Sequence, residues 1–166
     1  SSKFNNTSTK TLKDFGNKKI IGLTATREKV ARALTAVMNI ISFTEGGVSN
    51  KAKDLGYDDL FHIRLYAKME GGQLILIEKN EVIFIQPATS IQGEPLPVKY
   101  NSGSLTLNQL MQNAQKYMGK NFFVYDAFDN NCASFIVSIL KANNIWDDAD
   151  TKFLAQDVAS LKKSLP

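Results

Sequence analysis

Residues 60–86 read LFHIRLYAKMEGGQLILIEKNEVIFIQ, and this stretch decides the fold class. Apolar and polar side chains alternate through Leu60–Met69, which is typical of a strand with one face in a core. A Glu-Gly-Gly turn at 70–72 leads into a second strand over Gln73–Lys79, whose run of apolar residues suggests burial on both faces. A further turn precedes a third strand over Val82–Gln86. We therefore expect an antiparallel β-meander.

Helical patterns precede the meander. One apolar stripe recurs at helical spacing, at Val30, Leu34, Val37 and Ile41. With Thr24 or Thr26 as its N-cap, this stripe predicts a helix that runs to about Ser42. Residues Asn50 to Leu55 predict a second, short helix that ends at a glycine.

The chain returns to helix after the meander. Val98–Tyr100 predicts a short strand, and a capping box at 106–109 predicts a helix that ends at Gly119. Three more elements are expected: a strand or extended segment over Phe122–Tyr125, a helix over Cys132–Ala142, and a terminal helix from Asp157 to Leu165. Helices, a meander and helices again predict an α+β domain with the meander packed against helices.

Composition limits the classes of protein. The chain has 166 residues, 43% of them hydrophobic and 22% charged, which fits one folded domain. No apolar run reaches the roughly 18–20 residues needed to cross a bilayer. One cysteine and one histidine exclude an internal disulfide framework and a zinc module rich in these residues.

The net charge of +4 comes from the first nineteen residues, which hold five lysines and one aspartate. We expect 1–19 to be a basic flexible leader and 20–166 to form a single domain. The leader has no apolar core, so a secretory signal is not expected. Because 20–166 is neutral, no specific nucleic-acid partner is expected. A weak contact of the leader with a membrane surface or a polyanion is the alternative function for its charge.

The single cysteine and the single histidine form one candidate catalytic pair. Cys132 opens a predicted helix, where unpaired N–H groups and the helix dipole lower the pKa of a thiol. His62 lies on the first meander strand, and the hairpin brings Glu78 or Asn80 to its face. These residues could supply a nucleophile, a base and a group that orients the imidazole. The residues alone favour a simpler interpretation, a buried structural cysteine and a histidine bonded to its neighbours.

Two segments carry a resemblance to known proteins. Tyr57–His62 and the strand Leu76–Ile83 come first, and Asn130–Ile136 later opens a helix with Asn-Cys-x-x-Phe. This order resembles the circularly permuted papain-like cysteine hydrolases, the NlpC-like and lecithin:retinol-acyltransferase-like families, including viral members found in structural or polyprotein contexts. The resemblance implies a papain-like fold with Cys132 as nucleophile and His62 as base.

The same resemblance leaves the third catalytic position open. Acyltransferase-like members typically carry a second histidine there, and this chain has only one. Glu78 or Asn80 would therefore have to take that role.

Two functions follow as hypotheses. The first is a cysteine-dependent hydrolase or acyltransferase that cleaves an ester or amide through a thioester, with the backbone N–H of Cys132 as one oxyanion donor. Its substrate would be an acyl lipid, a peptide or a protein amide, and neither a metal nor an organic cofactor is expected. The second is a non-catalytic virion-associated or protein-interaction module that keeps the papain-like fold. The expected location is the cytoplasm or a virion.

Overall fold

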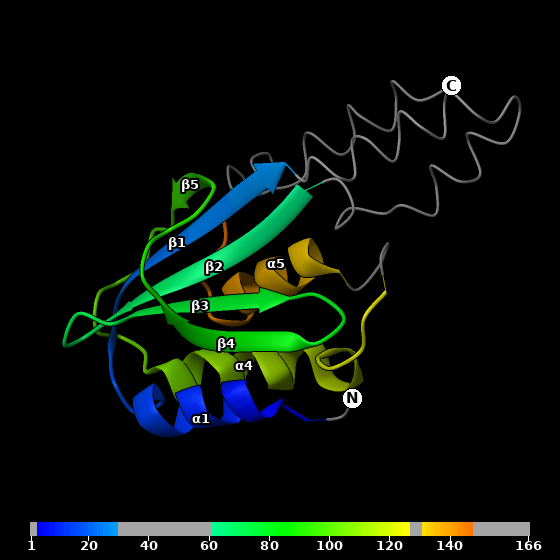
Figure 1. Ribbon diagram of the computed structural model, residues 1–166, viewed down its shortest axis with the longest axis horizontal. Helices are drawn as coiled ribbons and strands as arrows, with labels where there is room; N and C mark the ends of the chain where they lie inside the picture. Colours follow the sequence, from blue (N-terminus) through cyan, green and yellow to red (C-terminus); the bar gives the residue numbers. More distant parts are fainter. Residues whose placement is uncertain (1–2, 30–60, 127–130, 148–166) are drawn as a thin grey trace, which may run out of the picture.

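The computed structural model describes residues 3–29, 61–126 and 131–147. Within them the protein is an α+β fold, a five-stranded antiparallel sheet with three α-helices (Figure 1). The strands are β1 (Ile20–Lys29), β2 (Phe61–Met69), β3 (Leu74–Lys79), β4 (Ile83–Ala88) and β5 (Glu94–Pro97). Their order across the sheet is β4-β3-β2-β1-β5.

The predicted meander is confirmed as β2, β3 and β4. The β2–β3 hairpin pairs Leu65 with Ile77, and its turn contains Gly71 and Gly72 at φ of 97° and 98°. Residues with a Cβ rarely adopt such positive φ angles, so the two glycines fix where the turn forms. Burial along β3 alternates strictly, so only one of its faces lies in the core and not both.

Strand β1 corrects the helix predicted from Thr24 or Thr26. Both threonines lie inside β1, which pairs with β2 on one side and β5 on the other. The segment is rich in β-branched residues, which favour strands, and the apolar stripe that suggested a helix begins only after it. The remainder of that predicted helix and those predicted at 50–55 and 157–165 lie outside the described residues.

Helix α1 (Asn6–Phe15) occupies the segment that was expected to be a flexible leader. The side chain of Asn5 caps it by accepting a hydrogen bond from the backbone N–H of Ser8. Leu12 and Phe15 pack against the core, while the lysines remain on the solvent side. The basic residues therefore hid an amphipathic helix, and 1–19 is not a flexible arm.

Both edges of the sheet are closed to further strand pairing. On the β4 edge, the hydroxyl of Ser8 donates to the carbonyl of Ile83 (3.1 Å) and accepts from the N–H of Ile85 (2.9 Å). On the other edge, β5 is four residues long and two of them, Pro95 and Pro97, have no N–H. This strand replaces the one predicted at Val98–Tyr100, because the prolines fit an edge strand.

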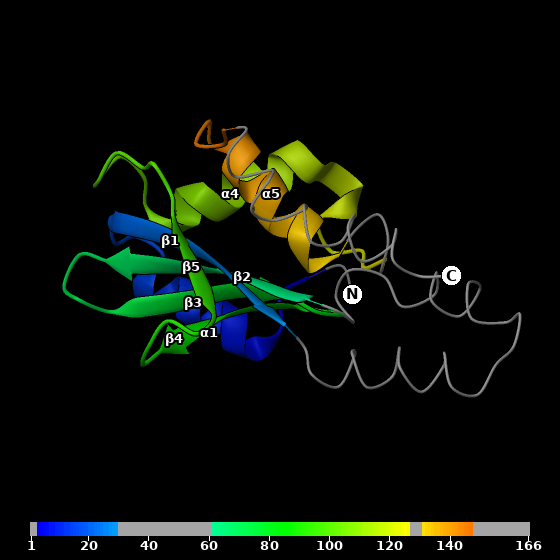
Figure 2. The same ribbon diagram turned by 90° about the horizontal axis from the view of Figure 1, so that it is seen from above.

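Helices α4 (Leu107–Met118) and α5 (Cys132–Ala142) cover one face of the sheet (Figure 2). The predicted capping box at the start of α4 is confirmed, with Thr106 and Gln109 bonded reciprocally. Apolar residues of both helices and of one sheet face form the core: Ile20, Leu23, Ala25, Ile63, Leu65, Ala67, Met69, Ile75, Ile77, Ile83, Ile85, Val98, Leu107, Leu110, Met111, Ala114, Phe122, Cys132, Phe135, Ile136, Ile139 and Leu140.

Lys79 ties the segment before α5 to the sheet. Its side chain is fully buried, and its amine donates to the carbonyls of Phe122 (2.8 Å) and Val124 (2.7 Å). The same amine lies 5.2 Å from the ring centre of Phe135 in α5. The 3-10 turn η1 (Gly119–Asn121) leads into this segment. Of the two expectations for Phe122–Tyr125, a strand or an extended segment, the strand does not form, because these carbonyls accept from one cation and not from a neighbouring strand.

Candidate functional site

Side chains alternate along each strand, so the sheet has two chemically different faces. One face packs under α4 and α5, whose apolar side chains share the core with those of this face, and Lys79 on the same face contacts Phe135 of α5. We call the opposite one the outer face. It carries the side chains of Thr24, Glu28, His62, Arg64, Tyr66, Lys68, Leu74 and Glu78.

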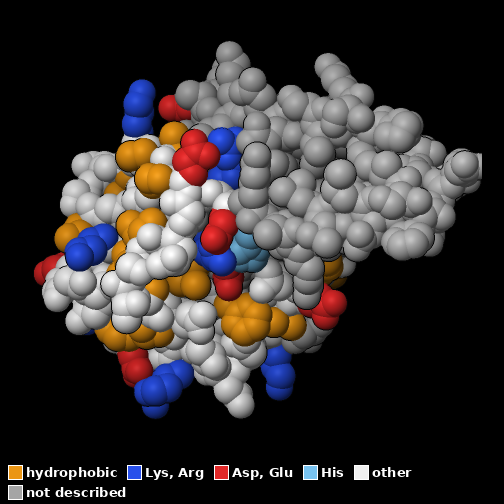
Figure 3. All heavy atoms as spheres, turned by 45° about the horizontal axis from the view of Figure 1, so that its top comes forward, with side chains coloured by type: hydrophobic (Ala, Val, Ile, Leu, Met, Phe, Trp, Pro, Cys, Tyr) orange, Lys and Arg blue, Asp and Glu red, His pale blue; other side chains and the backbone are white. Residues whose placement is uncertain are grey.

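An ion-pair network occupies one end of the outer face. The carboxylate oxygen Oε2 of Glu78 lies 2.6 Å from Nε2 of His62 and 3.1 Å from Nε of Arg64. Nη1 of Arg64 lies 2.6 Å from Oε2 of Glu28 on β1. Figure 3 shows acidic and basic side chains gathered around the histidine on this side of the molecule.

The electrostatics of the network follow from its partial burial. Burial alone would raise the pKa of Glu78, but the hydrogen bond from His62 and the charges of His62 and Arg64 outweigh it and lower that pKa below 4.5. The carboxylate is therefore ionised and can only accept, so Nε2 of His62 is the donor. Burial also disfavours the charge of Arg64, but the bonds to Glu28 and the charge of Glu78 raise its pKa.

The structure brings Glu78, and not Asn80, to His62. Continuing the β2–β3 register by one step sets Arg64 opposite Glu78, which leaves His62 diagonal to the carboxylate. Asn80 lies beyond the end of β3, where its side chain is exposed and its backbone N–H bonds within the turn. The orienting group expected beside the imidazole is therefore Glu78.

Cys132 lies at the first position of α5, as expected. Asn131 caps the helix by accepting from the N–H of Ser134 at 2.9 Å. The cysteine has no exposed surface and belongs to the core between the helices and the sheet.

The sheet therefore separates the two expected catalytic residues. His62 projects to the outer face together with Glu78. Lys79, the next residue after Glu78 in β3, points to the opposite face, and Cys132 packs in the core on that face. The hairpin assembles a base and its orienting carboxylate, but it does not bring them to the thiol. A proton transfer from Cys132 to His62 requires that the thiol and the imidazole reach the same side of the sheet, and here they lie on opposite faces.

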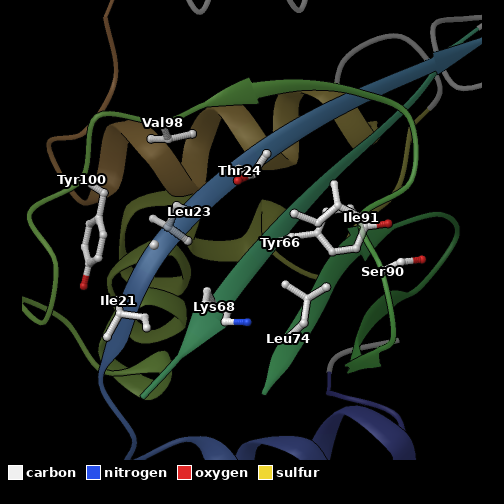
Figure 4. A pocket seen from close by; sticks show the side chains of 11 residues that line it. Ile21, Leu23, Thr24, Tyr66, Lys68, Leu74, Ser90, Ile91, Val98 and Tyr100 are labelled. Carbon is white, nitrogen blue, oxygen red and sulfur yellow. The ribbon is translucent and has the colours of Figure 1, made fainter. Parts of the chain in front are cut away.

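A pocket of about 590 Å³ lies at the other end of the outer face. Ile21, Leu23 and Tyr66 form part of its lining together with Lys68, Leu74 and Ile91 (Figure 4). A register shift between Ile20 and Gly22 leaves Ile21 without a cross-strand partner, and this residue is 42% exposed at the rim. The volume is within the range of small-molecule sites, roughly 300–1,000 Å³.

Among the described residues, no three His, Cys, Asp or Glu side chains are grouped so that they could hold a metal ion. None of the helices in these ranges has the length and apolar character that a membrane span requires.

Comparisons with known proteins add no relative: no family model matches the chain, and neither the curated proteins nor the solved structures contain a match. The papain-like assignment therefore stays a prediction. Sequence reasoning missed Glu28 and the pocket because both depend on β1, whose second half was predicted to begin a helix at Thr24 or Thr26. The β-branched run at 20–26 was the signal for that strand.

Proposed function

We propose that this chain is a non-catalytic interaction domain that binds its ligand on the outer face of the sheet. The observation that carries the proposal is the position of Cys132 and His62 on opposite faces. The imidazole is bonded to Glu78, and the thiol is without solvent exposure. A role in structural or virion contexts, and the papain-like class of the fold, remain parts of this proposal.

The thiol hydrolase or acyltransferase is the second candidate. The position of Cys132 at a helix start favours it, because that position favours a thiolate. The 2.6 Å contact between His62 and Glu78 also favours it, because it resembles the base and orienting group of a catalytic triad. An acyl-lipid, peptide or protein-amide substrate would belong to this candidate. It requires an arrangement in which the imidazole reaches the thiol.

Labelling of the cysteine distinguishes the two candidates. Cys132 is the only cysteine in the chain, so the rate of reaction with iodoacetamide reports on this thiol alone. For a buried structural thiol, labelling of the folded protein requires opening of the structure. We expect the folded protein to react at least about 100-fold more slowly than the urea-unfolded protein, which corresponds to an opening free energy of roughly 2.7 kcal/mol.

Two variants sharpen the test, because loss of the imidazole slows labelling only if His62 activates the thiol. His62→Ala removes the imidazole, and Glu78→Gln weakens the same network but keeps the imidazole. For an interaction domain, both variants leave the labelling rate unchanged or raise it through lower stability. A folded protein that labels faster than the unfolded one, and that is slowed by His62→Ala, would establish the hydrolase instead.

A further inference from the structure

The pocket on the outer face combines several apolar side chains with hydroxyl groups and one cation. Tyr66 is almost fully buried and Leu74 is half-buried on the outer face, so these two side chains form the apolar floor of the pocket. Ile21 and Ile91 stand at its rim and are 42% and 43% exposed. Among the residues that line it, Lys68 is the single ionic side chain.

Lys68 differs from Arg64 and Arg27 because no acidic partner for it lies among the described residues. Arg64, on the same strand and the same face, is paired with Glu28 and Glu78. Arg27 is paired with Glu94. Within residues 3–29, 61–126 and 131–147, no carboxylate lies within ion-pair distance of Lys68, so its positive charge is available to a bound anion.

The loop that borders the pocket is fixed to the sheet. The backbone N–H of Gln92 donates to the hydroxyl of Tyr66 at 3.2 Å, and the amide of Gln92 donates to Ser90 at 2.6 Å. Figure 4 shows Ser90 and Ile91 on this loop beside Tyr66. The wall that contains Ile91 is therefore built in advance, which reduces the entropy lost on binding.

We infer that this pocket binds a small amphiphilic carboxylate, with its aliphatic tail against the apolar wall and its head group at Lys68. Phosphate sites usually offer several cations or N–H donors, whereas the pocket offers one cation with the hydroxyls of Thr24 and Ser90. A carboxylate, which carries a single negative charge and accepts hydrogen bonds, matches one cation and two hydroxyls. The inference rests on the proposed function, because it names the ligand class that the outer face receives.

The test is isothermal titration of the intact chain with hexanoate, octanoate and decanoate, and with decanol as a neutral ligand of equal tail length. We expect each two-carbon extension to lower Kd about tenfold, because about 0.8 kcal/mol is gained for each buried methylene. We expect decanol to bind roughly three- to tenfold more weakly than decanoate, and added salt to reduce the difference.

Two pairs of variants locate the ligand. Lys68→Gln should weaken decanoate binding to the level of decanol, whereas Lys116→Gln, an exposed lysine on α4, should leave it unchanged. Ile91→Glu should abolish binding through a charge at the rim, whereas Val82→Glu, in the β3–β4 turn, should not. All four positions are exposed, so these variants should fold.

Three results would overturn the inference: no saturable binding of decanoate, equal affinity for decanol and decanoate, or full affinity in Lys68→Gln. Binding of an acidic aliphatic tripeptide in place of decanoate would assign the pocket to a peptide ligand and also reject it. A reactive, His62-dependent Cys132 would reject the proposed function, and the titration would still report separately on the pocket.

Discussion

Glu78 is the centre of the ion-pair network, and its replacement by glutamine gives the most informative perturbation of the fold. Glu78→Gln keeps the shape of the side chain and removes its charge. The carboxylate now bonds His62 at 2.6 Å and Arg64 at 3.1 Å, while its own side chain is only 12% exposed. The amide oxygen of glutamine can still accept one bond, so the variant measures the charge and one lost hydrogen bond.

The magnitude follows from this burial. Hydrogen bonds to a charged group contribute about 1.5–3 kcal/mol when they are shielded from water. Arg64 keeps Glu28 in the variant, which limits the loss. We expect Glu78→Gln to lower the free energy of unfolding by about 2 kcal/mol at pH 7 and the Tm by about 4–8 °C.

The pH dependence has a defined sign. The pKa of Glu78 is lower in the folded protein than its usual value of 4.5, so the ionised carboxylate favours folding. Its contribution is fully present above about pH 4.5 and is lost as the pH falls through the lowered pKa. The difference in unfolding free energy between the wild-type chain and Glu78→Gln should therefore narrow below pH 4.5.

Urea unfolding followed by circular dichroism measures both effects. Glu94→Gln is the matched control, because Glu94 also lies 2.8 Å from an arginine but is 60% exposed. This control should cost less than about 0.5 kcal/mol, as is usual for exposed ion pairs. An equal cost for the two variants, or a difference that persists at the acid end of the titration, would refute the reasoning.

Two further predictions concern contacts that hold the fold together. Lys79→Met should lower the free energy of unfolding by roughly 3 kcal/mol, because it leaves the carbonyls of Phe122 and Val124 without their donor. Chemical unfolding measures this free energy. The control Lys116→Met should change the same free energy by under about 0.5 kcal/mol. Ser8→Ala should cost about 1–3 kcal/mol and increase aggregation in light scattering, because it leaves the carbonyl of Ile83 and the N–H of Ile85 at the β4 edge without their partner. Exposed Thr9→Ala is its control, and equal behaviour within either pair would contradict the assigned contact.

Much of the sheet and of the helical layer could be predicted from local patterns. The β2–β3–β4 meander follows from alternation and from the glycine pair at 71–72. Helices α4 and α5 begin where capping residues Thr106 and Asn131 stand. These signals are local, because a turn glycine or a cap acts within a few residues of itself.

The elements that were missed depend on partners distant in the sequence. Strand β1 exists because β2 and β5 pair with it, and the helical stripe that follows it in the sequence obscured its β-branched residues. Helix α1 looked like a solvated leader, since its buried contact with β4 uses the hydroxyl of Ser8 and not a long apolar face. The face on which His62 would lie relative to Cys132 depends on sheet register and helix placement together, so the sequence could not decide it.

The arrangement of β2 links the two ends of the outer face. Its alternate residues run from His62 and Arg64, which both bond to Glu78, to Tyr66 and then to Lys68 at the pocket. With both sheet edges closed, strand addition is an unfavourable way for a partner to bind the described part of the chain. A ligand that approaches the outer face meets the mutually bonded side chains of the network at one end. At the other end it meets Lys68, which has no acidic partner among the described residues, beside apolar side chains. Binding there should therefore depend on Lys68 and be insensitive to His62, which separates the ligand site from the network by charge as well as by position.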